Sequence, residues 1–280
     1  MDNLIGILSA VVSVVGAIVA GVMTSWSSRK ATAFEAKLER ERHEETKAEQ
    51  AAKVLGRYRE PLLLAANSLQ SRLFNAVRDE YLPVYLHCGD PEQEDYARQF
   101  TVYTLAEYLC WVEIIRRELR FLDLGGEEQN REFTKRLLDV TNTLSSQKYE
   151  RAHYRLFRGQ QRAIGELMMQ PGAEGHHDCI TYPEFTRRLD EDPRFRYWFE
   201  RLLREVDDIA DQSEAGNARV IDTQRALIDL IDFLDPDKTR LGADHRAKYV
   251  EATPSPAPPP TSPTGSSPSV TTVSARPAAG

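Results

Sequence analysis

The feature that most constrains this chain is an uncharged apolar run near its N-terminus. Residues 4–23 read LIGILSAVVSVVGAIVAGVM and contain no Asp, Glu, Lys or Arg. A helix rises 1.5 Å per residue, so this run would be roughly 30 Å long, which matches the hydrocarbon core of a bilayer. A cleaved signal peptide would start with positive charge, whereas the only charged side chain before this run is Asp2. We therefore expect one transmembrane helix within an anchor of residues 1–28.

The charges around the apolar run predict its orientation. No Lys or Arg precedes it, and five basic residues follow it closely: Arg29, Lys30, Lys37, Arg40 and Arg42. Loops rich in Lys and Arg remain in the cytoplasm. We expect a single-pass protein of the plasma membrane, with its N-terminus outside and everything after the span in the cytoplasm.

Small residues recur along one face of the expected span, at Ser9, Ser13, Ala17 and Gly21. Small residues at every fourth position let two helix backbones approach closely, which drives association in lipid. The pattern is compatible with homo-oligomers, and also with the general abundance of Ala, Gly and Ser in membrane helices.

Residues 29–56 predict a charged helical stalk, because Glu, Arg and Lys are frequent in it and Gly and Pro are absent until Gly56. Apolar positions give only broken heptads, so a dimeric coiled coil and a solvated spacer both remain open. Interleaved glutamates argue against a polybasic lipid-binding patch.

Residues 57–250 have the period of helices almost throughout, which predicts an all-α, bundle-like domain. Pro61 suits the first turn of one helix, and Asp90 with Pro91 starts a second helix that should be central and reach about Leu124. Further helices are expected at 128–146 and 150–169, after Thr181, after Asp192 and at 217–234, with a loop from Pro171 to Cys179.

The last segment, residues 251–280, is expected to be disordered. Residues 252–280 hold eight prolines and no Leu, Ile, Phe, Trp or Tyr. Such a segment buries too little apolar area to offset the entropy of ordering. Residues 254–263 could instead form a polyproline II ligand, although a solubilising tail is the simpler interpretation.

The composition and the motifs argue against several classes of function. The formal net charge of −7 argues against a nucleic-acid partner, which requires a basic face. Three cysteines do not suggest a disulfide framework. His176, His177 and Cys179 match no established zinc spacing, and Glu150 with His153 supplies only half of a di-iron motif. We find no cofactor motif, metal site or catalytic constellation.

Three groups of polar residues are candidate sites. The first two, on neighbouring predicted helices, could meet in one network: Gln70, Arg72 and Asn75, and Glu113, Arg116 and Arg117. Buried charges must be paired, so such a network favours a structural role over a binding site. The third group, Arg155, Arg158 and Arg162, would share a helical face that could bind an anion or an acidic partner, or be solvated.

Three stretches carry a family resemblance: YREPLLLAANSLQSRLFN at 58–75, AEYLCWVEIIRRELRFLDL at 106–124 and RLFRGQQRAIGELM at 155–168. They resemble an uncharacterised bacterial family of N-terminally membrane-anchored helical proteins, over most of residues 57–205. The resemblance implies a shared fold and no activity.

Together these features favour a membrane-tethered helical interaction or regulatory module, which binds a cytoplasmic protein partner, over an enzyme. The alternative is a helical enzyme, or a domain that binds a small ligand or anion, with its site around Arg72, Glu113 and Arg117. That alternative predicts that these three side chains converge in one pocket.

Overall fold

A computed structural model describes residues 37–40, 42, 43, 46, 56–78, 81–87, 90–118, 127–212 and 216–250. The predicted span with its small-residue face, most of the stalk and the proline-rich tail lie outside these residues. The described stalk residues are helical and exposed. Within the described ranges, every helix is too short or too polar to cross a bilayer.

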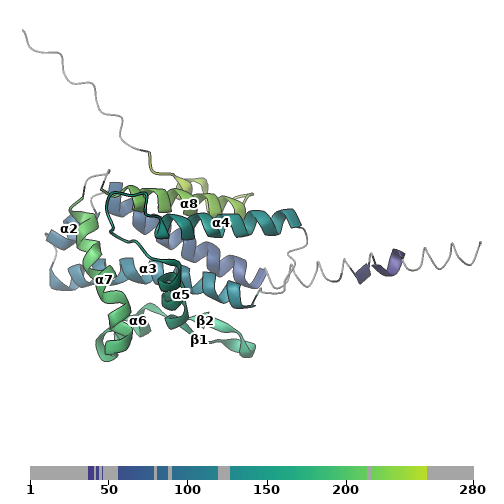
Figure 1. Ribbon diagram of the computed structural model, residues 1–280, viewed down its shortest axis with the longest axis horizontal. Helices are drawn as coiled ribbons and strands as arrows, with labels where there is room; N and C mark the ends of the chain where they lie inside the picture. Colours follow the sequence, from purple (N-terminus) through teal and green to yellow (C-terminus); the bar gives the residue numbers. More distant parts are fainter. Residues whose placement is uncertain are drawn as a thin grey trace, which may run out of the picture. The chain divides into compact units, whose positions relative to one another are not determined.

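The described part of the chain is mostly helical, as predicted (Figure 1). A helix at residues 56–78 is followed by α2 (Tyr81–His87), α3 (Pro91–Glu118), α4 (Glu127–Ser145), α5 (Arg158–Leu167), α6 (Tyr182–Glu191), α7 (Pro193–Ala210) and α8 (Ala218–Leu234). Two short strands, β1 (Met169–Pro171) and β2 (His177–Cys179), pair antiparallel. This hairpin replaces part of the predicted loop.

α3 is the central helix, as its apolar circumference predicted. It contacts α2, α5, α6, α7 and β2, and it buries thirteen of its residues. Its start is fixed as expected, because Asp90 Oδ1 accepts a hydrogen bond from Gln93 N at 2.9 Å. The helix at 56–78 also packs along it, since Tyr58 bonds to Glu118 at one end and Arg72 stacks on Phe100 near the other.

α4 and α8 lie side by side, and α8 supplies an unusual cap to α4 (Figure 1). Arg219, only 3% exposed, donates from Nη1 to the carbonyl oxygens of Thr143, Leu144 and Ser146 at 2.9–3.0 Å. A cation is favourable at the negative end of the α4 dipole. The arginine thereby satisfies carbonyl groups that the end of a helix leaves without partners.

Two predicted elements differ from the structure. Pro61 does not lie in a first turn, because the chain is already helical at residue 56. The helix predicted at 150–169 begins only at Arg158. Before it, Tyr154 adopts a positive φ of 55° while its backbone N–H donates to Glu205 on α7, and this interaction holds the segment as a loop.

Candidate functional site

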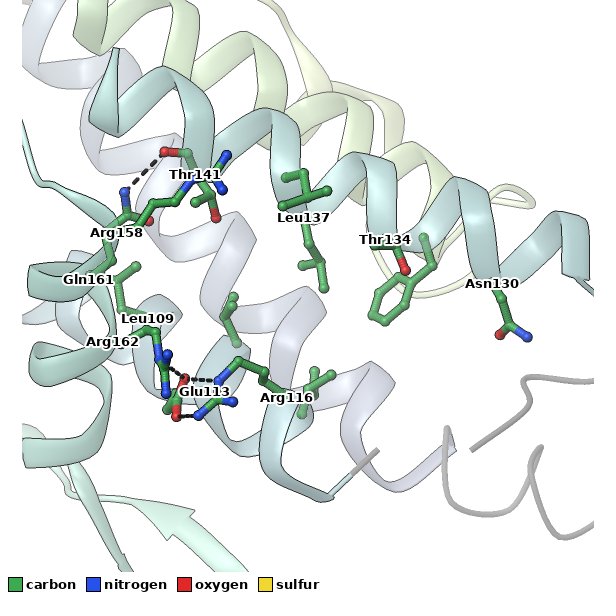
Figure 2. A pocket seen from close by; sticks show the side chains of 14 residues that line it. Leu109, Glu113, Arg116, Asn130, Thr134, Leu137, Thr141, Arg158, Gln161 and Arg162 are labelled. Carbon is green, nitrogen blue, oxygen red and sulfur yellow. Dashed lines mark hydrogen bonds and ion pairs between the residues drawn. The ribbon is translucent and has the colours of Figure 1, made fainter. Parts of the chain in front are cut away.

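Helices α3, α4 and α5 line an open groove with a volume of about 530 Å³ (Figure 2). Its size falls within the range of pockets that bind small molecules or side chains of a partner. The lining is Leu109, Val112, Glu113, Ile115 and Arg116 of α3; Asn130, Phe133, Thr134, Leu137, Leu138 and Thr141 of α4; and Arg158, Gln161 and Arg162 of α5.

The floor of the groove is apolar. It consists of Leu109, Val112 and Ile115 from α3 and Phe133, Leu137 and Leu138 from α4. The inner side of Phe133 stacks on Phe233 of α8 with ring centroids 6.0 Å apart, so the floor continues into the core. Leu138 is 42% exposed, whereas Leu109, Ile115 and Phe133 are almost fully buried. A groove with a mainly apolar lining and a few polar side chains is typical of binding sites.

One wall of the groove is basic and is organised by the buried carboxylate of Glu113, whose side chain is 2% exposed. Arg116 Nε donates to Glu113 Oε2 at 2.6 Å, and Arg117 Nε donates to Oε1 at 3.1 Å. Arg162 Nε lies 3.8 Å from Oε2 (Figure 2). Burial raises the pKa of Glu113, but the hydrogen bonds from Arg116 and Arg117 outweigh it and lower the pKa below its usual value.

A close helix contact places the α5 arginines beside Glu113. A Cβ added to Gly165 would lie 2.6 Å from the carbonyl oxygen of Leu109 and 2.9 Å from Glu113 Cβ. Only glycine therefore lets α5 approach α3 this closely. The sequence contains no sign of this, because Gly165 is one of two glycines in the helix predicted at 150–169, and only the packing distinguishes it from Gly159.

The wall has more positive than negative charge. Arg117 also pairs with Glu166 at 2.6 Å, and Arg158 Nη2 donates to the neutral Asn142 amide oxygen at 2.7 Å. Among the residues that line the groove, three arginines thus stand against one carboxylate: Arg116, Arg158 and Arg162 against Glu113. Arg162 remains 55% exposed on its side chain, so it can reach a ligand in the groove.

The three arginines of the predicted face lie on two different segments of the structure. Arg158 and Arg162 lie on α5 and line the groove, as an anion-binding face requires. Arg155 lies in the loop before α5, and its guanidinium stacks on Phe157 with 5.2 Å between its Cζ and the ring centroid. The expectation that all three share one helical face was therefore wrong for Arg155.

The six residues predicted to form one network do not all meet in the structure. Glu113, Arg116 and Arg117 are together, whereas Gln70 bonds to Gln224 of α8 at 3.1 Å and to the His245 carbonyl at 2.9 Å. Arg72 stacks on the rings of Tyr81, Tyr96 and Phe100, and Asn75 is exposed. Phe100 precedes Glu113 by thirteen residues of α3, about 20 Å along the helix.

A second polar cluster joins the hairpin to the end of α3. The Glu118 carboxylate accepts a hydrogen bond from Tyr58 and one from His177 N at 3.1 Å. Nδ1 of His176 and Nδ1 of His177 lie 3.1 and 3.2 Å from its oxygens. Burial raises the pKa of Glu118, but these hydrogen bonds outweigh it and lower the pKa to about 2. Among the described residues, no three His, Cys, Asp or Glu side chains are arranged to hold a metal ion.

The contribution of α4 to the groove was missed in the sequence. Its signal was present, because Phe133, Leu137 and Leu138 belong, with Val140 and Leu144, to the apolar residues of an amphipathic helix. That pattern predicts one buried stripe, and it does not say that half of the stripe faces an open groove.

Fold and site together define a helical domain with an open, apolar groove walled by arginines. Comparisons with protein-family models, curated proteins and solved structures found no match for this chain. Its function must therefore be inferred from its own geometry.

Proposed function

We propose that this chain is a membrane-tethered helical interaction module whose α3–α4–α5 groove binds a segment of a cytoplasmic protein partner. The observation that carries the proposal is the groove itself, since an apolar floor beside excess positive charge fits an apolar helix face flanked by carboxylates. An amphipathic helix docks in such grooves through residues at i, i+3 or i+4, and i+7. The N-terminal span with the following basic residues supports the tether and its cytoplasmic side.

The test is photo-crosslinking in living cells from inside the groove. A photoreactive p-benzoylphenylalanine would replace Leu138, which lines the groove and is 42% exposed. The control carries the same residue at Val84 on α2, which is 52% exposed and does not line the groove. We expect a discrete protein adduct from position 138 and none from position 84. Equal labelling at both positions would contradict the proposal.

A small anionic amphiphile is the second candidate occupant, because the groove volume suits a small molecule and arginines bind carboxylate or phosphate. In the same experiment it would add a small mass to the chain without a second protein. The enzyme version of this alternative has no geometric support, since Arg72 stacks on Phe100 far along α3 from Glu113.

A further inference from the structure

Two cysteines from different elements meet where the hairpin packs on the central helix. Cys110 lies on α3 and is completely buried, whereas Cys179 ends β2 and is 8% exposed. Both are free thiols. A hydrogen bond joins the two thiol groups. The fold therefore holds two reduced sulfur atoms as neighbours, with one of them at the edge of the core.

The contacts on either side of the two cysteines fix how β2 lies along α3. The backbone N–H of His177 donates to Glu118 Oε1 at 3.1 Å. The hydroxyl of Tyr103 donates to the carbonyl oxygen of Ile180 at 3.2 Å. β2 therefore runs in the direction opposite to α3, and each cysteine lies between these two contacts. The approach of the two thiols thus follows from the register of the strand on the helix, independently of the sulfur atoms.

This arrangement favours a disulfide bond at equilibrium but makes it slow to form. Because the fold already holds the two sulfur atoms together, their reaction with each other needs little further loss of chain entropy. The hydrogen bond from Cys110, followed by burial, raises the pKa of the Cys179 thiol. The thiolate is the form that attacks a disulfide, so a raised pKa lowers the rate. Proximity therefore sets the equilibrium, and burial sets the rate.

We infer that Cys110 and Cys179 are a reversible disulfide site, which links β2 covalently to α3 when the chain meets a small disulfide as oxidant. The Cys179 sulfur is the exposed one of the two, so it loses its proton and attacks the oxidant. One thiol leaves, and a mixed disulfide remains on Cys179. Cys110 then loses its proton and attacks the Cys179 sulfur, and the second thiol leaves. The chain loses two protons and two electrons, and the oxidant becomes two thiols.

The inference does not depend on the groove or on a partner. It concerns the attachment of the hairpin, which the structure holds on α3 through Glu118 and Tyr103 without a covalent bond. A bond between Cys110 and Cys179 would add a covalent link between these two contacts. It would slow the opening of the hairpin away from α3.

The test is thiol–disulfide equilibration of the full chain in a mild detergent. The chain has three cysteines, and Cys88→Ser leaves Cys110 and Cys179 as its only thiols. The chain would be held in mixtures of 2-mercaptoethanol and its disulfide until the composition stops changing, then alkylated with a maleimide under denaturing conditions and weighed by mass spectrometry. In oxidising mixtures we expect a monomer that is two hydrogens lighter and takes up no maleimide. Excess 2-mercaptoethanol should restore two maleimide sites.

The control is Cys179→Ser in the same background, which leaves only Cys110. Because Cys110 is completely buried, we expect it to stay reduced in every mixture while circular dichroism shows that the chain is folded. Two free thiols, a stable mixed disulfide or a disulfide-linked dimer of the chain that carries both cysteines would overturn the inference.

A second measurement tests the link between the hairpin and the helix. Amide hydrogen exchange should be slower in β1 and β2 of the bridged chain than in the reduced chain. A bridged chain with unchanged exchange in the hairpin would overturn the proposal that the bond secures β2 on α3.

Discussion

At the scale of single residues, the basic wall depends on Glu113. Its carboxylate is 2% exposed and meets Arg116 and Arg117 directly. Removing one partner of a buried pair leaves the other charges without compensation. We expect Glu113→Gln to lower the free energy of unfolding by about 2 kcal/mol, as measured by urea unfolding of the full chain in a mild detergent and followed by helical circular dichroism.

Glu166 gives the matched control for this prediction. It also pairs with an arginine, Arg117, but its side chain is 44% exposed. Exposed ion pairs contribute little, so Glu166→Gln should change stability by less than about 0.5 kcal/mol. Equal effects of the two substitutions would show that Glu113 is not the centre of the wall.

Glu118 predicts a dependence of stability on pH. Its pKa falls from 4.5 to about 2 on folding because Tyr58, His176 and His177 bond to the carboxylate. A carboxyl group with a lowered pKa stabilises the fold above its unfolded pKa, and this stabilisation is lost as the pH falls from about 4.5 to about 2. Glu118→Gln should flatten the stability profile in that window.

The measurement is the unfolding midpoint of wild type and Glu118→Gln at a series of acidic pH values. The two profiles should lie furthest apart above pH 4.5 and converge near pH 2. Parallel profiles would mean that Glu118 does not link the hairpin to α3 through its charge.

At this scale the sequence predicted which residues were chemically important better than it predicted their partners. Glu113 with Arg116 and Arg117 is local to one helix, so spacing alone placed the three side chains together. Gln70 and Arg72 find partners on α8, α2 and α3, through contacts between elements that spacing does not determine. To predict that they lie far from Glu113, one would need to know the register in which the helix at 56–78 packs on α3.

At the scale of elements, the contact of α5 with α3 depends on Gly165. Gly165→Ala would place a methyl group against the backbone of Leu109, and the two helices would have to separate. Overpacking of this kind costs about 1–3 kcal/mol, so we expect that loss of stability in urea unfolding.

Gly159 in the same helix is the control, because a Cβ at this position would meet nothing within 4 Å. Alanine is the better helix former, so Gly159→Ala should be neutral or should stabilise the chain by up to about 1 kcal/mol. A neutral Gly165→Ala would show that α5 does not need its close approach.

The elements that could be predicted were those with local start signals. Asp192 caps α7 by accepting hydrogen bonds from Arg194 N and Phe195 N, at the place that its Asp-Pro sequence indicates. The hairpin was missed because its strands have three residues each, too few for a visible alternation. The late start of α5 was missed because Glu205 and Arg219 lie far from that loop in the sequence.

At the scale of the whole molecule, the proposed tether predicts how the chain fractionates. Because residues 4–23 are long and apolar enough to span a bilayer, the full chain should stay in the membrane pellet after alkaline extraction. A chain lacking residues 1–28 should be released from the pellet, because it has lost the apolar run. Release of the full chain by alkali would remove the tether from the proposal.

The most direct test of the central claim is the yield of the Leu138 photo-adduct after removal of the groove charges. With Arg158→Gln and Arg162→Gln together, we expect the yield of the protein adduct to fall on the order of tenfold, because the partner's carboxylates lose their charge-assisted bonds. With Arg194→Gln and Arg204→Gln, two exposed arginines of α7 that do not line the groove, the yield should stay at the wild-type level. An unchanged yield in the groove variant would contradict the account of the groove as an arginine-walled site for an acidic partner.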